Sequence, residues 1–367
     1  MSNFKSFDKD FILNLTEASG YDFNKDCIRN GTVNNAIIYG HNGVGKSNLA
    51  LAIFDIIEHL TDKKINDFAY LNYRNAYNTS NVVDFYYEFL IDSRIVTYEY
   101  KKADYKTLVY ERFSVDGEEQ VLFDRTMGQY FTAKIEGVET LKKEINNNEL
   151  SVLKYIKNNA ALDNTIKNTV FLKFFEFIER MLFFRSLQQD RMFLGFENKS
   201  RLYVWKEIIE KGNVQDFEKF LNIAGIDCKL AIEEELDKKD IVFDFNGKKL
   251  PFEQIASTGT IAIAVFYYWY QSIREKSIVS FLFIDEFDAF YHHELSRLVV
   301  EKLKETGVQF VLTTHNTSIL TNDLLRPDCY FLMNKQTISP LSKCTHKELR
   351  EAHNIEKMYK ARTFNVD

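Results

Sequence analysis

Several features that would place the chain in other classes of protein are scarce or absent. Its 367 residues include only three prolines and four cysteines, and no apolar run approaches the roughly 20 residues of a membrane-spanning helix. Few prolines together with 32 phenylalanines argue against long linkers and disorder. The cysteines lack the CxxC spacing of zinc or redox sites, and the polar start does not resemble a targeting peptide. We therefore expect a folded cytoplasmic protein without a membrane anchor.

Positive charge is not in excess either. The formal net charge is −6 and is spread through the chain rather than gathered in a tail. A protein that covers DNA with a broad surface normally presents a basic face. The short basic clusters 101–102 and 142–143 fit a solvated surface better than a nucleic-acid site. The composition therefore does not indicate a nucleic-acid partner, although it leaves one open.

The most informative stretch is 40–47, which reads Gly-His-Asn-Gly-Val-Gly-Lys-Ser. It matches G-x-x-x-x-G-K-[ST], the pattern of a phosphate-binding P-loop. The apolar run 36–39 before it suits a buried strand, and the segment 48–60 after it carries apolar side chains at helical spacing. Strand, glycine loop and helix, in that order, form the context that the motif requires.

This P-loop predicts a nucleotide site that uses Mg²⁺. Glycines let the backbone approach an anion closely, and the N–H groups of the loop and the positive end of the following helix face that anion. We expect Lys46 to reach the β- and γ-phosphates and the Ser47 hydroxyl to bind Mg²⁺. The predicted nucleotide-binding residues are Gly40, His41, Asn42, Gly43, Val44, Gly45, Lys46, Ser47 and Asn48.

Two further apolar segments end in polar residues that suit the same site. Residues 281–286 read Phe-Leu-Phe-Ile-Asp-Glu, and residues 308–315 form a second apolar run that ends in histidine. Ligands of parallel α/β sheets bind at the carboxyl ends of strands, so we expect these side chains beside the P-loop. Asp285 is the predicted second Mg²⁺ ligand. Glu286 and His315 are the predicted catalytic residues, with Glu286 as the base that polarises the attacking water.

Three motifs together resemble the ABC-type AAA ATPases of the SMC, RecF and OLD group. They are G-x-N-G-x-G-K-S at 40–47, hydrophobic-Asp-Glu at 283–286 and Thr-Thr-His at 313–315. The tail at 354–360 resembles the closing segment of RloA/AbiL-type ATPases of bacterial anti-phage and abortive-infection systems. The resemblance implies an α/β P-loop NTPase fold of ABC-ATPase type: a mixed sheet, an antiparallel β-layer and an inserted helical lobe. It covers both ends of the chain well and the middle poorly.

The resemblance also implies a second half of the site, contributed by another subunit. In these relatives a signature loop caps the γ-phosphate that the opposite subunit holds. Here Ser257 and Gly259 match that loop, whereas Thr258 stands where the family usually has glycine. One chain carries one P-loop and one such loop, so a complete site implies a homodimer or higher homo-oligomer. Transporter-type relatives place an aspartate where this chain has His292, so communication between subunits is expected to differ in detail.

The pattern of elements predicts three segments. Residues 1–135 carry the P-loop and, from about 81 to 125, short β-rich pieces that predict the antiparallel β-layer. Residues 136–240 look helical and are the expected inserted lobe. Residues 241–367 return to the core with the signature loop, the Asp-Glu strand and the histidine strand. No long heptad run is present, so the coiled-coil arms of true SMC proteins are not expected.

Two short stretches allow more than one assignment. Residues 334–337 read Asn-Lys-Gln-Thr and lack the aspartate of the guanine-reading N-K-x-D element, so ATP is the expected nucleotide. Gln188, in the stretch 187–191, is a candidate Q-loop residue and a further candidate Mg²⁺ ligand. A polar surface turn explains that stretch equally well.

The function predicted from these features is a slow ATPase. We expect a nucleotide-gated dimer that regulates a separately encoded effector, such as a nuclease or toxin, in bacterial anti-phage defence. The chain shows neither the acidic cluster of a Toprim nuclease nor the R-x-x-x-x-H of HEPN-type RNases, which is why a separate effector is expected. The alternatives are a DNA-repair or recombination ATPase of the RecF/SMC type, and an ATP sensor that does not hydrolyse its ligand. Glu286 favours hydrolysis.

Overall fold

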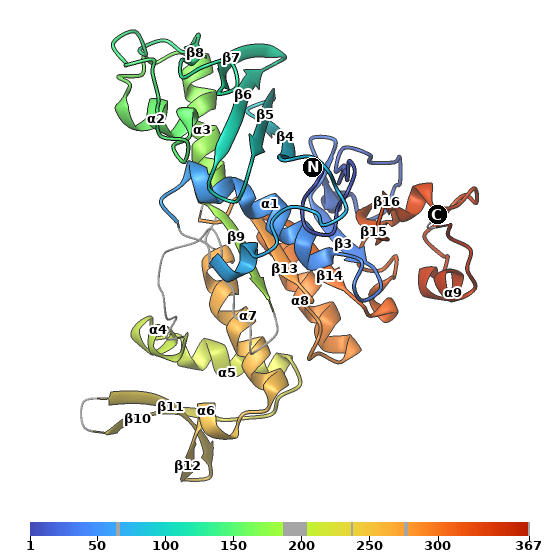
Figure 1. The fold of residues 1–367 in the computed structure, drawn as a ribbon. Helices are drawn as coiled ribbons and strands as arrows, with labels where there is room; N and C mark the ends of the chain where they lie inside the picture. The colour runs from blue at the N-terminus through green and yellow to red at the C-terminus, as the bar shows by residue number, and fades with distance from the viewer. Residues whose placement is uncertain (64–66, 186–203, 236–237, 275–277, 366–367) are drawn as a thin grey trace.

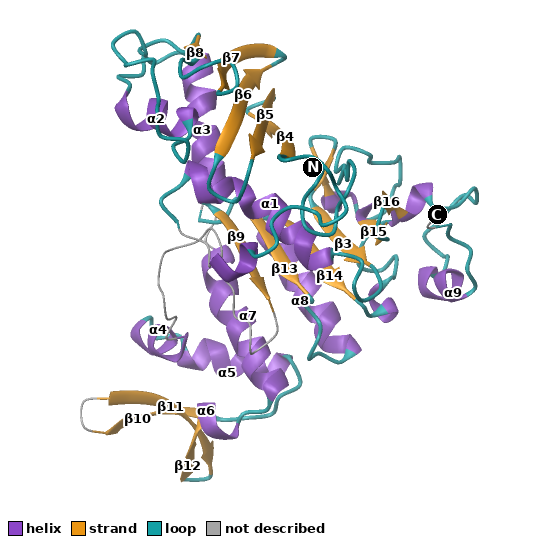
Figure 2. Ribbon diagram, in the orientation of Figure 1, coloured by secondary structure: helices purple, strands orange, loops and turns teal. Residues whose placement is uncertain are grey.

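A six-stranded mixed sheet forms the centre of the computed structural model (Figures 1 and 2). The structure describes residues 1–63, 67–185, 204–235, 238–274 and 278–365. The strand order is β16-β15-β3-β14-β13-β9, and all pairs are parallel except β15 with β16. The strands are β3 (Asn35–Tyr39), β9 (Met181–Arg185), β13 (Phe281–Asp285), β14 (Gln309–Thr314), β15 (Tyr330–Met333) and β16 (Ile338–Pro340). The carboxyl ends of five strands therefore lie along one edge.

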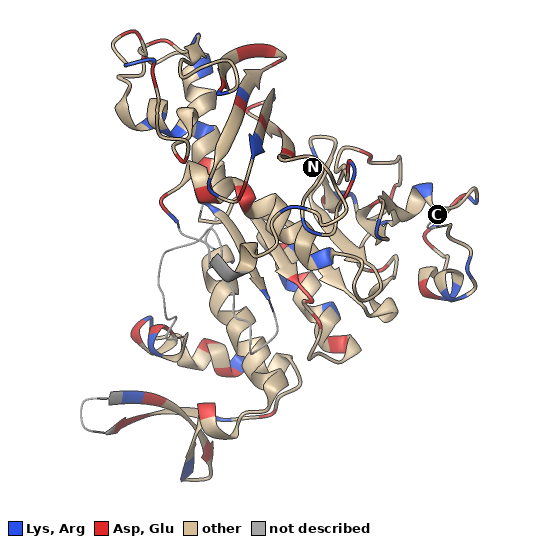
Figure 3. Cartoon of the chain, viewed as in Figure 1, with Lys and Arg blue, Asp and Glu red and all other residues tan. Residues whose placement is uncertain are grey.

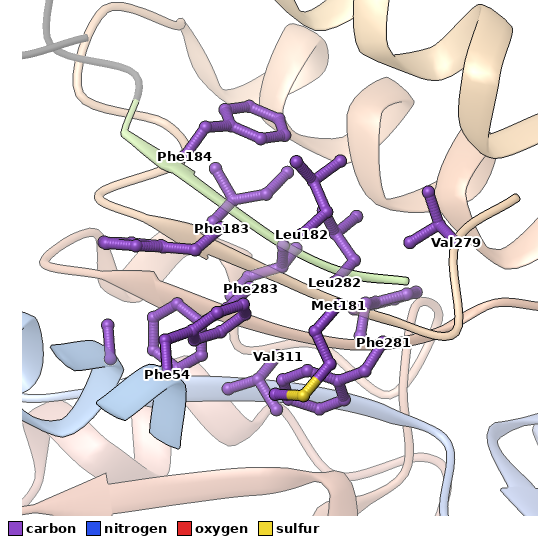
Figure 4. Close-up of a cluster of buried hydrophobic side chains, with 14 of the residues drawn as sticks. Phe54, Met181, Leu182, Phe183, Phe184, Val279, Phe281, Leu282, Phe283 and Val311 are labelled. Carbon is purple, nitrogen blue, oxygen red and sulfur yellow. The ribbon is translucent and has the colours of Figure 1, made fainter. Parts of the chain in front are cut away.

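Helices cover both faces of this sheet, as its near-continuous apolar strands require. Successive residues of β9 point to opposite faces, and Figure 4 shows Phe183 and Phe184 on the two sides. The Phe183 ring lies 5.5 Å from Phe54 of α1 (Lys46–Leu60), and the Phe184 ring stacks at 6.1 Å on Trp269 of α7 (Thr258–Arg274). Helix α8 (His293–Thr306) packs beside α7. The core sheet is thus held between α1 and the α7–α8 pair.

An antiparallel β-layer lies beyond α1, as the resemblance predicted (Figure 1). Its five strands follow in chain order and pair with their neighbours. They are β4 (Val83–Ile91), β5 (Arg94–Lys102), β6 (Leu108–Val115), β7 (Glu118–Asp124) and β8 (Thr132–Ala133). Helices α2 (Val152–Asn159) and α3 (Ile166–Glu179) accompany this layer. Aromatic rings join them, because Phe174 of α3 lies 5.2 Å from Phe113 and 5.7 Å from Tyr98.

A buried polar cluster joins α1 to the β-layer. Asp55 of α1 is fully buried and accepts hydrogen bonds from Lys102 Nζ at 2.7 Å and from the hydroxyls of Tyr73 and Tyr100, each at 2.8 Å. Burial and the Asp55 carboxylate raise the pKa of both tyrosines well above the ordinary value, so both keep the protons that they donate. Lys102 was expected on a solvated surface, and that expectation is wrong: its side chain is fully buried, while the neighbouring Lys101 is exposed.

A third group of elements has its own aromatic core at the end of the molecule opposite the β-layer (Figure 1). Phe252 lies at its centre, with its ring 4.9 Å from Trp205, 5.6 Å from Phe217 and 4.9 Å from Phe243. Its strands form an antiparallel sheet in the order β10-β11-β12. The elements are α4 (Val204–Glu210), α5 (Val214–Ile223), β10 (Leu230–Glu235), β11 (Lys238–Phe245), β12 (Lys248–Pro251) and α6 (Phe252–Ile255).

The structure differs from the single helical lobe expected over residues 136–240. Helices α2 and α3 pack on α1, and β9 pairs with β13 inside the core sheet. Of the described residues of this stretch, α4, α5, β10 and the start of β11 belong to the third group. The reason is the aromatic face of α3, which is buried against the β-layer. This stretch is therefore divided among three places, and it contains strands as well as helices.

The remaining elements are short. They are the 3₁₀ helices η1 (Lys25–Cys27), η2 (Asp67–Tyr70), η3 (Thr317–Ile319), η4 (Pro327–Cys329) and η5 (Leu341–Lys343), the strands β1 (Ile28–Arg29) and β2 (Thr32–Val33), and the helix α9 (Ile355–Lys360). Acidic and basic residues are interspersed over all parts of the ribbon (Figure 3). Within the described residues, no helix is both long enough and apolar enough to span a bilayer.

Replacing Lys102 with methionine tests the buried cluster. The change leaves the Asp55 carboxylate buried without its cation, so we expect the free energy of unfolding to fall by about 3–5 kcal/mol. The matched control is Lys101→Met, because Lys101 makes an exposed ion pair with Asp84. That change should cost at most about 1 kcal/mol. Urea unfolding followed by circular dichroism compares the two variants, and equal losses would contradict the assignment.

Candidate functional site

Glycines shape the loop between β3 and α1. Gly43 and Gly45 have φ angles of 76° and 106°, in the left-handed region that favours glycine. A Cβ at Gly45 would lie 2.6 Å from Ser6 Oγ, and one at Gly40 would lie 2.8 Å from the carbonyl oxygen of Met333. Side chains are therefore excluded at both ends of the loop. His41, Asn42 and Gly43, between them, are exposed and accessible to a ligand.

Lys46 is the first residue of α1, and its ammonium folds back over the loop. Nζ donates to the carbonyl oxygens of Gly40 at 2.7 Å and His41 at 3.1 Å, and it lies 3.0 Å from His315 Nδ1. Burial lowers the pKa of Lys46, and the carboxylates of Asp285 and Glu286 raise it in opposition. Carbonyl oxygens are weaker partners for an ammonium than phosphate oxygens are, so an anion in the loop would take over these hydrogen bonds.

His315 links the loop to the second catalytic candidate. Its Nδ1 lies 3.0 Å from Lys46 Nζ and from the Gly40 carbonyl oxygen, and its Nε2 lies 3.1 Å from Glu286 Oε1. An ammonium can only donate and a carboxylate can only accept, so the neutral imidazole that suits Lys46 and Glu286 accepts at Nδ1, and the Gly40 carbonyl oxygen is then a close neighbour of Nδ1 without a hydrogen bond to it. In that tautomer Nε2 carries the proton and donates it to the Glu286 carboxylate. The imidazole therefore holds the side chain of Glu286 toward the P-loop.

Asp285 connects three elements of the site through one buried carboxylate. Its Oδ2 accepts a 2.5 Å hydrogen bond from Ser47 Oγ, and its Oδ1 accepts from Thr313 Oγ1 at 2.7 Å. Arg185, at the end of β9, places its Nε 3.2 Å from Oδ2. The two predicted Mg²⁺ ligands thus lie within hydrogen-bond distance of each other.

The residues present fit a magnesium ion. A hydroxyl and a carboxylate are oxygen ligands of the kind that Mg²⁺ uses, usually with only one or two carboxylates and with substrate phosphates and water completing the shell. Ser47 and Asp285 supply such a pair, one from α1 and one from β13. When bound there, Mg²⁺ would neutralise charge on the β- and γ-phosphate oxygens.

A strained turn directs Glu286 out of the sheet. Its φ is 50°, which is unusual for a residue other than glycine, and such strain is often found at functional sites. Thr313 stabilises the turn, since its hydroxyl accepts from the Glu286 backbone N–H at 2.8 Å while it donates to Asp285. Thr314 donates to the carboxylate of Asp288, whose pKa is raised by burial. The two threonines before His315 therefore hydrogen-bond to Asp285, Glu286 and Asp288, on both sides of the turn.

The signature-loop candidates lie elsewhere. Ser257 caps α7 by accepting from the Thr260 backbone N–H at 3.1 Å, and Ser257 and Thr258 are exposed. A Cβ at Gly259 would lie 3.1 Å from the carbonyl oxygen of Phe290, in the segment after β13. Figure 1 shows α6, which precedes this loop, far from the P-loop helix α1. One chain does not bring these residues to its own P-loop.

The other candidates have different places. Gln188 and the rest of the stretch 187–191 lie outside the described residues. His292 caps α8, because its Nδ1 accepts from the Leu295 backbone N–H at 3.3 Å. Asn48 donates to Ser6 Oγ at 2.9 Å, so the opening segment of the chain supports the P-loop helix.

Sequence reasoning missed Arg185 and Ser6. Arg185 ends the apolar run 181–184, which is the same signal, an apolar strand followed by a polar residue, that identified Asp285 and His315. Ser6 carries no signal of its own, because its contact with Gly45 depends on how the opening segment folds back.

Comparison with known proteins agrees with this arrangement. A family profile described as "AAA domain, putative AbiEii toxin, Type IV TA system" matches residues 36–321, whereas no curated protein matches the chain. Among solved structures, the chain is similar to the SMC head domain from Thermotoga maritima, with 15% identity over 92% of this chain and 96% of that chain and a TM-score of 0.41. It is also similar to the Pyrococcus furiosus Smc head bound to the C-terminal domain of ScpA, with 11% identity over 93% of this chain and 95% of that chain and a TM-score of 0.45. A third similar structure is the recombination mediator protein RecF, with 13% identity over 93% of this chain and 96% of that chain and a TM-score of 0.40. The predicted α/β P-loop fold is confirmed.

Proposed function

We propose that this chain, which belongs to the AAA-domain family described as putative AbiEii toxin, Type IV TA system, binds Mg·ATP and hydrolyses it slowly. The observation that carries the proposal is the meeting of three strand ends. Lys46 after β3, Asp285 and Glu286 after β13, and His315 after β14 lie within hydrogen-bond reach of one another or of Ser47. Each has the chemistry that phosphoryl transfer to water requires.

The geometry supports a role for each side chain. Lys46 holds the β- and γ-phosphates, and Glu286 orients a water molecule for in-line attack on the γ-phosphorus. As the water oxygen bonds to phosphorus, the bond from phosphorus to the β–γ bridging oxygen breaks and ADP leaves. The proton of the water passes to Glu286. His315 keeps the Glu286 carboxylate in place through its Nε2–H.

We also propose that the complete site forms between two copies of the chain. Ser257 and Thr258 are exposed at the start of α7, directly after α6, which Figure 1 shows far from the P-loop helix α1. A two-fold head-to-tail dimer would set the signature loop of each copy against the nucleotide of the other. Nucleotide binding then favours the dimer, because the bound phosphate supplies contacts that exist only across the interface.

The biological role that we propose is control of a separately encoded effector in anti-phage defence. The family description names a toxin and a toxin–antitoxin system, and the tail at 354–360 resembles that of RloA/AbiL-type ATPases. A dimer that opens and closes with nucleotide can act on a partner by binding one of its states more tightly than the other. We expect the effector, a nuclease or toxin, to be the product of a neighbouring gene.

Two substitutions separate chemistry from assembly. Glu286→Gln should lower the turnover rate about 10²–10⁴-fold, because the base is lost, while ATP binding remains. With ATP it should form a stable dimer by light scattering. Adding Ser257→Arg to this variant should abolish the ATP-dependent dimer and spare ATP binding by the monomer. Asn146→Arg, which adds the same charge to an exposed loop, is the control. A monomer that hydrolyses ATP at a rate independent of protein concentration would contradict the composite site.

A plaque assay tests the proposed role. Cells that carry this gene and its neighbour should resist phage, and resistance should be lost with Lys46→Ala or Glu286→Gln or without the neighbour. Protection by the gene alone, or protection that persists in Lys46→Ala cells, would contradict the control of a separate effector by ATP.

A further inference from the structure

We propose that Arg185 recognises the terminal phosphate of ATP: it neutralises Asp285 in the nucleotide-free protein and turns to the γ-phosphate in the complex. The proposal rests on the proposed ATP site. It adds a residue that neither the sequence motifs nor the expected roles include, and it assigns that residue the distinction between ATP and ADP.

The position of Arg185 in the sheet supports this role. Strand β9 is parallel to β13, and the register sets Arg185 directly beside Asp285. The neighbouring strands β13, β14 and β3 bring Asp285, His315 and Lys46 to the same edge. Strand β9, which follows β3, β14 and β13 in the sheet, thus contributes Arg185 to this edge. It lies on the side of Asp285 that faces away from the P-loop strand β3.

The hydrogen bonding of the Arg185 guanidinium is incomplete at Nε. Arg185 Nε lies 3.2 Å from Asp285 Oδ2, but its N–H does not point at that oxygen. The atom is buried and has no hydrogen-bond partner among the residues that the structure describes. Oδ2 already accepts the 2.5 Å hydrogen bond from Ser47. A buried donor without an acceptor is costly, so the arrangement favours the arrival of another acceptor.

The balance of charge at the site also supports this role for Arg185. At this edge Lys46 and Arg185 balance the carboxylates of Asp285 and Glu286. An arginine stays charged in any protein environment, and its planar fork of N–H groups matches phosphate oxygens. Once Asp285 serves as a metal ligand, the ion pair with Arg185 is no longer needed to compensate its charge. The side chain is 19% exposed, so it retains a path toward the ligand that lies on the same edge.

The test compares ATP with ADP in a background that does not turn over. In Glu286→Gln protein, isothermal titration measures the affinities for Mg·ATP and Mg·ADP. Adding Arg185→Ala should weaken Mg·ATP binding about 10–100-fold, the loss of one charge-assisted hydrogen bond, and should change Mg·ADP binding by less than about 3-fold. The control is Arg180→Ala. Arg180 lies just before β9 in an exposed ion pair with Glu176, and its loss should change neither affinity.

The outcomes separate this proposal from the one on which it rests. If the parent protein binds neither nucleotide, both proposals fail. If the Glu286→Gln parent binds ATP more tightly than ADP, two results would overturn the role of Arg185 alone. In the first, Arg185→Ala keeps the preference for ATP, and in the second, it weakens ATP and ADP binding equally. Circular dichroism checks that the variant folds. Arg185→Gln, which keeps a donor group but no charge, is the second variant and should show the same loss confined to ATP.

Discussion

The buried carboxylate of Asp285 is the interaction on which the rest of the site depends. A charge out of water must be paired or hydrogen-bonded, and Asp285 meets that need with Ser47, Thr313 and Arg185. These partners come from α1, β14 and β9. The Asp285 carboxylate can therefore be buried only where α1, β14 and β9 each place a partner side chain beside it. The parallel register of the core sheet is the constraint that brings them there.

The same constraint explains the position of the P-loop helix. Ser47 fixes the first turn of α1 to the core sheet, and Asp55, about 12 Å further along the helix, fixes its middle to the β-layer through Lys102 and Tyr100 of β5. The helix that presents its positive end to a phosphate is thus anchored by polar contacts at two points.

Much of the site could be predicted because its signals are local. Backbone angles and close contacts within the loop require its glycines. Asp285 and His315 each come at the end of an apolar run. The misses are contacts between distant segments. Arg185 ends a run that continues directly from the aromatic residues of α3, and short apolar runs do not distinguish helix from strand. Residues 136–240 are divided among three places because the aromatic face of α3 packs on the β-layer. The spacing of the aromatic residues predicts a buried face, but it does not identify the element on which that face packs. Lys102 looks like surface charge until Asp55 is placed beside it.

The central claim is that the ends of adjacent parallel strands form one site for Mg·ATP around Lys46, Ser47 and Asp285. Isothermal titration of Mg·ATP into the wild-type chain and into Lys46→Ala tests it most directly, with the exposed Lys25→Ala as the control. We predict one ATP bound per chain, an affinity about 100-fold weaker in Lys46→Ala because the phosphates lose a charged donor, and no change in the control. Wild-type affinity in Lys46→Ala would contradict the account.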